Sequence, residues 1–133
     1  MGAEDYLLTT TVNGILAQRL VRTLCGHCRQ PHKALPEVVE QMNLRRYVPE
    51  GDIVLYKPVG CSECAGTGYW GRVCIIEMLT MSEEIERLTA ASAPSSEIRR
   101  QARREGMRTM REDGVLKVLT GQTTLAELAR TVA

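Results

Sequence analysis

Two short stretches decide the fold of this chain: Cys25-Gly26-His27-Cys28 and Cys61-Ser62-Glu63-Cys64, with 32 residues between them. In each stretch two residues separate the cysteines, so the backbone can turn tightly and both sulfurs can reach one ion. Two such pairs together supply four thiolates, the ligand set of a closed structural zinc site. The sequence therefore predicts a structural Zn²⁺ held by Cys25, Cys28, Cys61 and Cys64.

Two other uses of these cysteines are less favoured. Cys-Gly-His-Cys is also the active-site tetrapeptide of protein disulfide isomerases, but there the motif follows a strand and opens a helix. Here a helical pattern precedes the motif, and Pro31 lies three residues beyond it. Structural disulfides are typical of secreted chains, whereas the acidic start Met1-Gly2-Ala3-Glu4-Asp5 has no apolar signal-peptide region.

The remaining cysteine and the two histidines are predicted to lie outside the metal site. Cys74 stands in the apolar run Val73-Cys74-Ile75-Ile76 and is expected to be a small buried side chain on a strand. His27 lies within the first cysteine pair and His32 shortly after it, so either could replace a cysteine. Four cysteines already complete a tetrahedral shell, and both histidines are interpreted as exposed loop residues.

Length and composition limit the possibilities. A chain of 133 residues forms one domain or two small subdomains. It has no Phe and only 4% aromatic residues, so a metal would compensate for a modest core. The net charge of +1 gives no overall attraction to nucleic acid or anionic lipid. No apolar run approaches the length of about 18 residues that a transmembrane helix needs.

Hydrophobic periodicity predicts a mainly helical α+β chain with a small zinc-ribbon-like β element that carries the two CxxC knuckles. Residues 5–24 show a helical stripe that can break or bend near Asn13-Gly14. Strands are expected at residues 53–58 and 73–79, paired with each other as a ribbon. Further helices are expected from Pro36 to Met42, from Ser82 to about Thr89, from Pro94 to Gly106, from Met107 to Leu119 and from a capping box at Thr124 onward.

No catalytic constellation is visible in the sequence. No glycine is followed by lysine, so a GxxxxGK[ST] phosphate loop is absent, and no Ser-His-Asp signature occurs. The basic residues comprise 14 Arg and 3 Lys, and the densest set is Arg99, Arg100, Arg103, Arg104, Arg108 and Arg111. Glutamates interrupt this set, which favours a solvated face over a contact surface for an acidic partner or lipid headgroup. Direct nucleic-acid binding is not expected, because the ribbon offers few basic and aromatic residues.

The whole chain resembles the C-terminal part of a type II secretion traffic ATPase (general secretion pathway protein E), and the related type IV pilus assembly ATPases are close. One matching stretch runs from Ala17-Gln18-Arg19-Leu20 to Cys25, and another is Gly60-Cys61-x-x-Cys64-x-x-Thr67-Gly68-Tyr69-x-Gly71-Arg72. Gly106-Met107, Asp113-Gly114, Lys117-Val118 and Gly121-x-Thr123-Thr124 match in the last third.

This resemblance implies a hexameric ATPase on the cytoplasmic face of the inner membrane that powers pseudopilus assembly and protein export. Its expected partners are neighbouring ATPase subunits and inner-membrane platform proteins. ATP and Mg²⁺ would bind only the parent protein, because the family's Walker A loop, acidic boxes and histidine box are missing here. The chain is thus expected to be an excised C-terminal piece that does not hydrolyse ATP by itself.

The resemblance also suggests a division of the chain. Residues 1–24 would be a helical remnant of the ATPase core, residues 25–75 the tetracysteine zinc-binding subdomain and residues 76–133 a C-terminal helical subdomain. Gln18 and Arg19 would lie nearest the nucleotide-bearing core. The alternatives are the equivalent part of a pilus assembly ATPase, or a free-standing zinc-ribbon adaptor that binds protein or nucleic acid.

Overall fold

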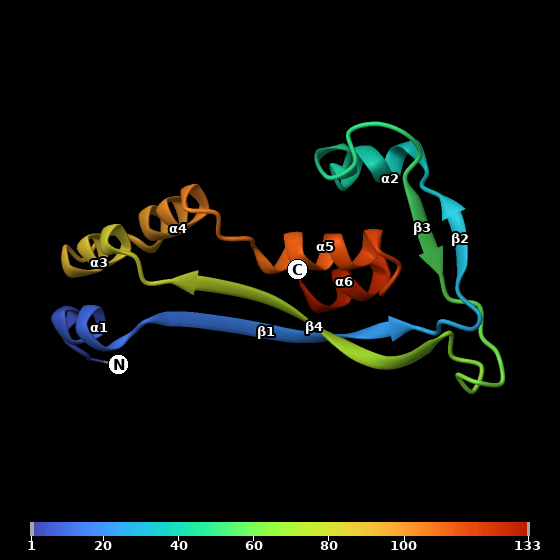
Figure 1. Ribbon diagram of the computed structural model, residues 1–133, viewed down its shortest axis with the longest axis horizontal. Coiled ribbons are helices and arrows are strands. Elements are labelled where there is room, and N and C mark those ends of the chain that lie inside the picture. Colours follow the sequence, from blue (N-terminus) through green and yellow to red (C-terminus); the bar gives the residue numbers. More distant parts are fainter. Residues whose placement is uncertain (1, 133) are drawn as a thin grey trace. The chain divides into compact units, whose positions relative to one another are not determined.

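The computed structural model describes residues 2–132 and confirms the α+β class (Figure 1). Helices form the larger share of the regular structure, and the strands form two separate two-stranded sheets. In chain order the elements are α1 (Asp5–Thr11), β1 (Gly14–Leu24), β2 (Gln30–Lys33), α2 (Pro36–Gln41), the 3-10 helix η1 (Leu44–Arg46), β3 (Val54–Lys57), β4 (Tyr69–Thr80), α3 (Glu83–Ala90), α4 (Ser95–Arg104), α5 (Met110–Leu119) and α6 (Leu125–Thr131).

The prediction of a helix through residue 24 is wrong. Helix α1 ends at Thr11, and the chain continues as the strand β1 from Gly14 to Leu24. The change of element falls at Asn13-Gly14, where the sequence allowed a break. The residues beyond it satisfy both a helical and a strand pattern, because the β-branched Ile15, Val21 and Thr23 also recur at even spacing. Pairing with a distant strand decides between the two, and local sequence does not report that pairing.

The predicted strand pairing is also wrong. Strand β4 pairs with β1, and β3 pairs with β2 in an antiparallel register that places Gln30 opposite Lys57 and Lys33 opposite Val54. Backbone hydrogen bonds at the two ends of the β1–β4 ribbon, from Met81 to Asn13 and from Cys25 to Gly68, show that these strands are antiparallel as well. The strands predicted at 53–58 and 73–79 both exist, but each has another partner.

The contacts divide the chain into two compact units, and neither unit is continuous in sequence. Unit 1 comprises residues 1–18 and 76–110, and unit 2 comprises residues 19–75 and 111–133. The division of the sequence into 1–24, 25–75 and 76–133 follows the chain and stays a prediction; its outermost positions, residues 1 and 133, lie outside the described range.

Each unit has its own buried side chains. Unit 1 buries Ile85 of α3 and Ala102 of α4. The core of unit 2 is larger and includes two of the cysteines; its buried apolar residues are Val21, Leu24, Cys25, Ala34, Leu44, Ile53, Leu55, Cys64, Ile75, Val115, Val118 and Leu128. The cysteine loops are therefore packed on an apolar core.

The predicted helix starts at Pro36, Ser82 and Thr124 are confirmed. Pro36 occupies the first turn of α2, where its missing N–H costs nothing. The Ser82 hydroxyl accepts a hydrogen bond from the N–H of Ile85 at the start of α3, and Thr124 does the same for Glu127 at the start of α6. Among residues 2–132, no helix is both long and apolar enough to cross a membrane.

Candidate metal centre

The four predicted ligand cysteines come together in unit 2. The first pair follows directly on β1, whereas the second lies in the loop that joins β3 to β4. Because β1 pairs with β4 and β2 pairs with β3, the loops 25–29 and 58–68 leave these strands side by side. The two sheets thus bring together cysteine pairs that are far apart in the sequence.

The sulfur positions fit a single tetrahedral ion. All four Sγ atoms lie within 4.8 Å of one another. The Sγ atoms of Cys25 and Cys61 are 3.8 Å apart, those of Cys28 and Cys64 are 3.8 Å apart, and those of Cys61 and Cys64 are 3.7 Å apart. A tetrahedron with metal–sulfur bonds of about 2.3 Å has edges of about 3.8 Å. Three of the six sulfur–sulfur distances therefore match the edges of a four-sulfur metal site.

Backbone amides surround the sulfurs and favour their negative charge. The N–H groups of Cys61 and Gly68 donate to Cys64 Sγ at 3.2 and 3.1 Å, and the N–H of Gly60 donates to Cys28 Sγ at 3.3 Å. Gly60 and Gly68 have positive φ angles of +102° and +81°. A Cβ at Gly68 would lie 2.5 Å from Pro58 Cβ, so only glycine brings this N–H to the sulfur without a clash.

The two thiols of the second pair differ in the direction of their pKa shifts. Burial acts to raise the pKa of Cys64, but the N–H groups of Cys61 and Gly68 and the neighbouring thiols lower that pKa to about 6. At Cys61 the N–H of Cys64 acts to lower the pKa, whereas desolvation and the thiols of Cys64 and Cys25 raise it to about 11. One thiol of the pair is thus close to its metal-binding, deprotonated form at neutral pH.

The other sulfur and nitrogen candidates are not part of this group. Among the described residues, the cluster that could hold a metal ion comprises Cys25, Cys28, Cys61 and Cys64 and does not include Cys74. Cys74 is a half-buried thiol on β4. His27 and His32 are exposed, and His32 Nδ1 lies 3.3 Å from the carbonyl oxygen of Lys33.

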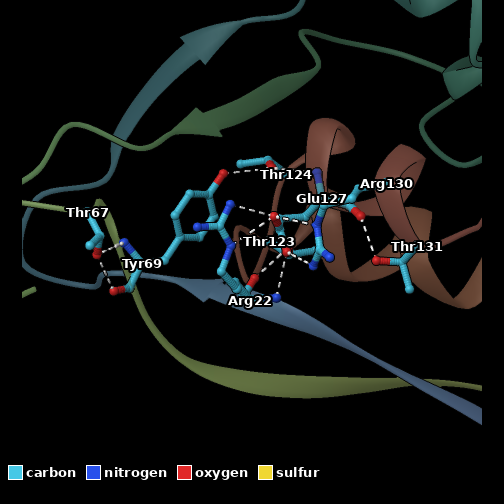
Figure 2. A network of polar contacts seen from close by, with 8 residues as sticks. All are labelled: Arg22, Thr67, Tyr69, Thr123, Thr124, Glu127, Arg130 and Thr131. Carbon is cyan, nitrogen blue, oxygen red and sulfur yellow. Dashed lines mark hydrogen bonds and ion pairs between the residues drawn. The ribbon is translucent and has the colours of Figure 1, made fainter.

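A buried carboxylate next to the cysteine loops was not expected from the sequence (Figure 2). Glu127 of α6 is 2% exposed, and its carboxylate accepts hydrogen bonds from both the backbone and the side chain of Arg22. The Arg22 Nη2–Oε1 distance is 2.7 Å, and Arg130 Nη2 approaches Oε2 at 2.9 Å. Burial acts to raise the pKa of Glu127, but these arginines lower it to about 2. The carboxylate is therefore charged at neutral pH.

This network connects α6 to the second cysteine loop. The guanidinium of Arg22 lies over the Tyr69 ring, 4.2 Å from its centroid, and the Tyr69 hydroxyl is 3.1 Å from Thr124 Oγ1. The backbone N–H of Tyr69 donates to the hydroxyl of Thr67, and this hydroxyl donates to the carbonyl oxygen of Cys64 at 2.7 Å. Contacts through Thr67, Tyr69 and Arg22 thus lead from Cys64, a candidate metal ligand, to Glu127.

A sequence signal for Glu127 existed but was interpreted differently. Thr124 and Glu127 form the capping-box pattern, and Thr124 does cap α6. In the usual box the acidic side chain returns to the cap residue, whereas here it binds Arg22 and Arg130. The partner Arg22 lies 105 residues away in sequence, so no local pattern could identify it.

The predicted basic set does not form one surface within one unit. Arg99, Arg100, Arg103, Arg104 and Arg108 belong to unit 1, whereas Arg111 belongs to unit 2 and contacts Met42 Sδ at 3.6 Å. Gln18 and Arg19 are exposed on β1. Their predicted proximity to a nucleotide stays a prediction.

Comparison with known proteins places these features in a family. The chain matches the family model described as type II/IV secretion system protein over residues 1–130. It is 50% identical over 130 residues to the type II secretion system protein E of Xanthomonas campestris pv. campestris, which covers 98% of this chain and 23% of that protein. It is 44% identical over 133 residues to the type IV pilus assembly ATPase PilB of Thermus thermophilus, which covers 99% of this chain and 15% of that ATPase.

A further relative is also a type II secretion system protein E. The type II secretion system protein E of Pectobacterium carotovorum subsp. carotovorum is 40% identical over 130 residues, which cover 98% of this chain and 25% of that protein. The chain thus spans a quarter or less of the length of these relatives.

Proposed function

The chain belongs to the family of type II/IV secretion system proteins, and we propose that it is the zinc-binding part of a hexameric ATPase that powers pseudopilus assembly and type II protein export. The parent enzyme would bind ATP and Mg²⁺ and act in the cytoplasm, peripheral to the inner membrane. The chain itself would be a structural and docking part, toward neighbouring subunits and the inner-membrane platform proteins of the secretion system.

The spacing of the four thiols carries the metal part of this proposal. Three sulfur–sulfur distances of 3.7–3.8 Å match the edges of a tetrahedral four-sulfur site. Zn²⁺ is the ion that thiolates in this arrangement bind most often in structural sites, and it would join the loops 25–29 and 58–68. Because two separate sheets deliver these loops, the ion would stabilise the tertiary structure of unit 2.

The secretion assignment rests on the relatives. Two of the three described above are type II secretion proteins, and the most similar of the three is one of them. A pilus assembly ATPase shares 44% identity, so the equivalent part of such an enzyme is the second candidate. Both candidates give the chain the same role within a motor protein.

The metal is tested by native mass spectrometry of protein purified without added metal, with reactive thiols counted before and after chelation. We expect one zinc ion per chain and four cysteines that react only after chelation. A chain without zinc that contains a Cys25–Cys28 disulfide would contradict the structural metal site and support redox chemistry.

The motor assignment needs a separate experiment. The chain would be co-expressed with the Xanthomonas campestris type II secretion protein E from which the matching residues have been deleted, and ATP hydrolysis by the copurified complex would be measured. We expect association and restored hydrolysis, with none by the chain alone. If the chain does not associate with the truncated ATPase but binds DNA or RNA in a salt-dependent manner, it would instead be a free-standing zinc-ribbon adaptor.

A further inference from the structure

The α5–α6 turn, residues 120–124, lies against the first cysteine pair within unit 2. Two hydrogen bonds join this turn to the end of β1. The N–H of Leu24 donates to the carbonyl oxygen of Gln122 at 2.8 Å. The hydroxyl of Thr123, which is fully buried, donates to the carbonyl oxygen of Arg22 at 2.7 Å. The turn is therefore fixed to the residues that come directly before the first cysteine pair.

Arg29 binds the same turn from the other end of the cysteine pair. It follows Cys28 directly, and its Nη1 donates to the carbonyl oxygen of Gly121 at 2.5 Å. Its guanidinium also lies over the ring of Tyr56 on β3, 4.7 Å from the ring centroid. The α5–α6 turn thus contacts residues on both sides of the first cysteine pair, and Arg29 makes the contact on the side of Cys28.

The local structure of the turn explains why its carbonyl oxygen attracts a cation. Gly121 has a positive φ of +79°, and its N–H donates to the carbonyl oxygen of Val118. The N–H of Gln122 donates to the carbonyl oxygen of Lys117. Together these bonds form the common helix terminus that ends on a glycine. Carbonyl groups at the C-terminal end of a helix carry partial negative charge, so the Gly121 carbonyl is a suitable acceptor for a guanidinium.

Position 121 has no room for a side chain. A Cβ on Gly121 would lie 2.6 Å from Arg29 Nη1 and 2.8 Å from Cδ2 of the Tyr56 ring. Glycine is therefore needed both for the positive φ and for the close approach of the guanidinium. An alanine here would push the Arg29 side chain away from the turn, so the contact can be removed from either side.

Cys28 is the candidate ligand that this contact can influence most. Cys25 is 1% exposed, and its N–H donates to the carbonyl oxygen of Gly68, so the core and the second cysteine loop both hold it. Cys28 is only half-buried, and its sulfur lies 3.8 Å from that of Cys64. Because Arg29 follows Cys28 directly, its contacts fix the backbone next to this sulfur.

We propose that Arg29 is a positioning residue for the metal site, which keeps Cys28 in the four-sulfur arrangement by joining it to the α5–α6 turn. This inference rests on the metal site proposed above and adds to it a residue that does not itself bind the ion. Residues that hold metal ligands in place commonly change metal affinity by about 10–100-fold when they are substituted. Coupling between two sites is reciprocal, so the bound ion also stabilises the turn.

The experiment loads the full chain with Co²⁺ in place of Zn²⁺, because the absorption bands of thiolate-bound Co²⁺ report the arrangement of the sulfurs. Affinity is measured by competition with a chelator. Arg29→Met keeps the length of the side chain but removes the donor, and Gly121→Ala breaks the same contact from the turn. The double variant tests whether both substitutions act through one contact. Far-UV circular dichroism shows which metal-loaded variants are folded.

Two control variants in unit 2 separate positioning from general stability. Arg45 also donates to the carbonyl oxygen of a glycine, Gly51, at 2.7 Å, so Arg45→Met removes a similar contact away from the α5–α6 turn. Val115 of α5 is 2% exposed, so Val115→Ala destabilises the core without removing a hydrogen bond of the cysteine loops.

We expect Arg29→Met and Gly121→Ala each to lower the affinity for Co²⁺ about tenfold and to shift its absorption bands. The double variant should lose no more affinity than the weaker single variant, and both controls should keep the bands of the unmodified chain. If Arg29→Met does not fold with metal bound, shifted bands in Gly121→Ala support the proposal and unchanged bands overturn it.

The outcomes also separate this inference from the metal site itself. Unchanged affinity and bands in Arg29→Met would overturn the positioning role alone. The same band shift in Val115→Ala would also overturn it, because Arg29 would then act only through the stability of unit 2. An unmodified chain that binds no Co²⁺ would overturn the proposed metal site, and this inference with it.

Discussion

Replacing Glu127 by glutamine tests how much the network around this residue contributes to stability. The substitution keeps the size of the side chain but removes its charge. It also places an NH₂ group where one oxygen accepts hydrogen bonds from Arg22 or Arg130. Because Glu127 is 2% exposed, water cannot replace these contacts. We therefore expect unit 2 to lose stability.

The expected loss follows from the pKa of the carboxyl group. A lowering from 4.5 to about 2 corresponds to about 3 kcal/mol of stabilisation at neutral pH. The side chains of Arg22 and Arg130 are 50% and 60% exposed, so solvent screens part of this interaction. We expect a loss of about 2 kcal/mol, which lowers the melting temperature by about 8 °C in a chain of this size.

The assay is thermal unfolding followed by circular dichroism at a fixed free zinc concentration. Glu84→Gln is the matched control, because Glu84 also pairs with an arginine through two hydrogen bonds but lies in an exposed ion pair. We expect no measurable change in stability, because solvent screens an exposed ion pair. The reasoning is refuted if Glu127→Gln has the same melting temperature as the unmodified protein, or if Glu84→Gln lowers the melting temperature as much as Glu127→Gln does.

The pH dependence gives a second readout of the same substitution. Folding lowers the pKa of Glu127, so its contribution is fully present above about pH 4.5 and is lost as the pH falls toward 2. The difference in stability between the unmodified chain and Glu127→Gln should therefore be constant from pH 7 to about pH 5. A difference that already shrinks above pH 6 would show that another group is responsible.

Four further substitutions concern the loop that carries the second cysteine pair and the strand β4 that follows it. Cys64→Ser should lose the metal and unfold unit 2, because the free energy of metal binding, about 10 kcal/mol, is largely folding free energy. Cys74→Ala should keep its full zinc content by mass spectrometry. An unchanged melting curve for Cys64→Ser, or zinc loss in Cys74→Ala, would contradict the four proposed ligands. Gly68→Ala should destabilise unit 2 by about 1–3 kcal/mol and speed zinc release to a chelator, because its Cβ would clash with Pro58; unchanged release would show that the loop can relax. Tyr69→Phe removes the hydroxyl contact to Thr124 and should cost about 1 kcal/mol in chemical denaturation with zinc content retained; a loss of zinc would mean that the hydroxyl supports the site itself.

The sequence predicted those features that depend on nearby residues. The cysteine spacing identified the four thiols that the structure brings together. The helix starts at Pro36, Ser82 and Thr124 were also correct, because a cap is a contact between residues two or three positions apart. Each cap and each single cysteine pair lies within one turn of the chain, whereas the meeting of the two pairs was predicted from the four ligands of a structural zinc site.

Features that depend on distant residues were missed. The strand β1 was predicted as a helix, because its leucines and valines fit a helical stripe until the pairing with β4 is known. The strand at residues 54–57 was assigned to the wrong partner for the same reason. Glu127 was interpreted through its neighbour Thr124, although its charge is balanced by Arg22, 105 residues away, and by Arg130.

The interleaving of the two units limits how this chain can recombine with its relatives. The polypeptide passes between the units after Gln18, Ile75 and Met110, so no single cut releases either unit as a continuous segment. A chimaera that exchanges only residues 25–75 would combine Tyr69 from one parent with Arg22 and Glu127 from the other. Functional hybrids should therefore need two segments from the same donor, residues 19–75 and 111–133, transferred together.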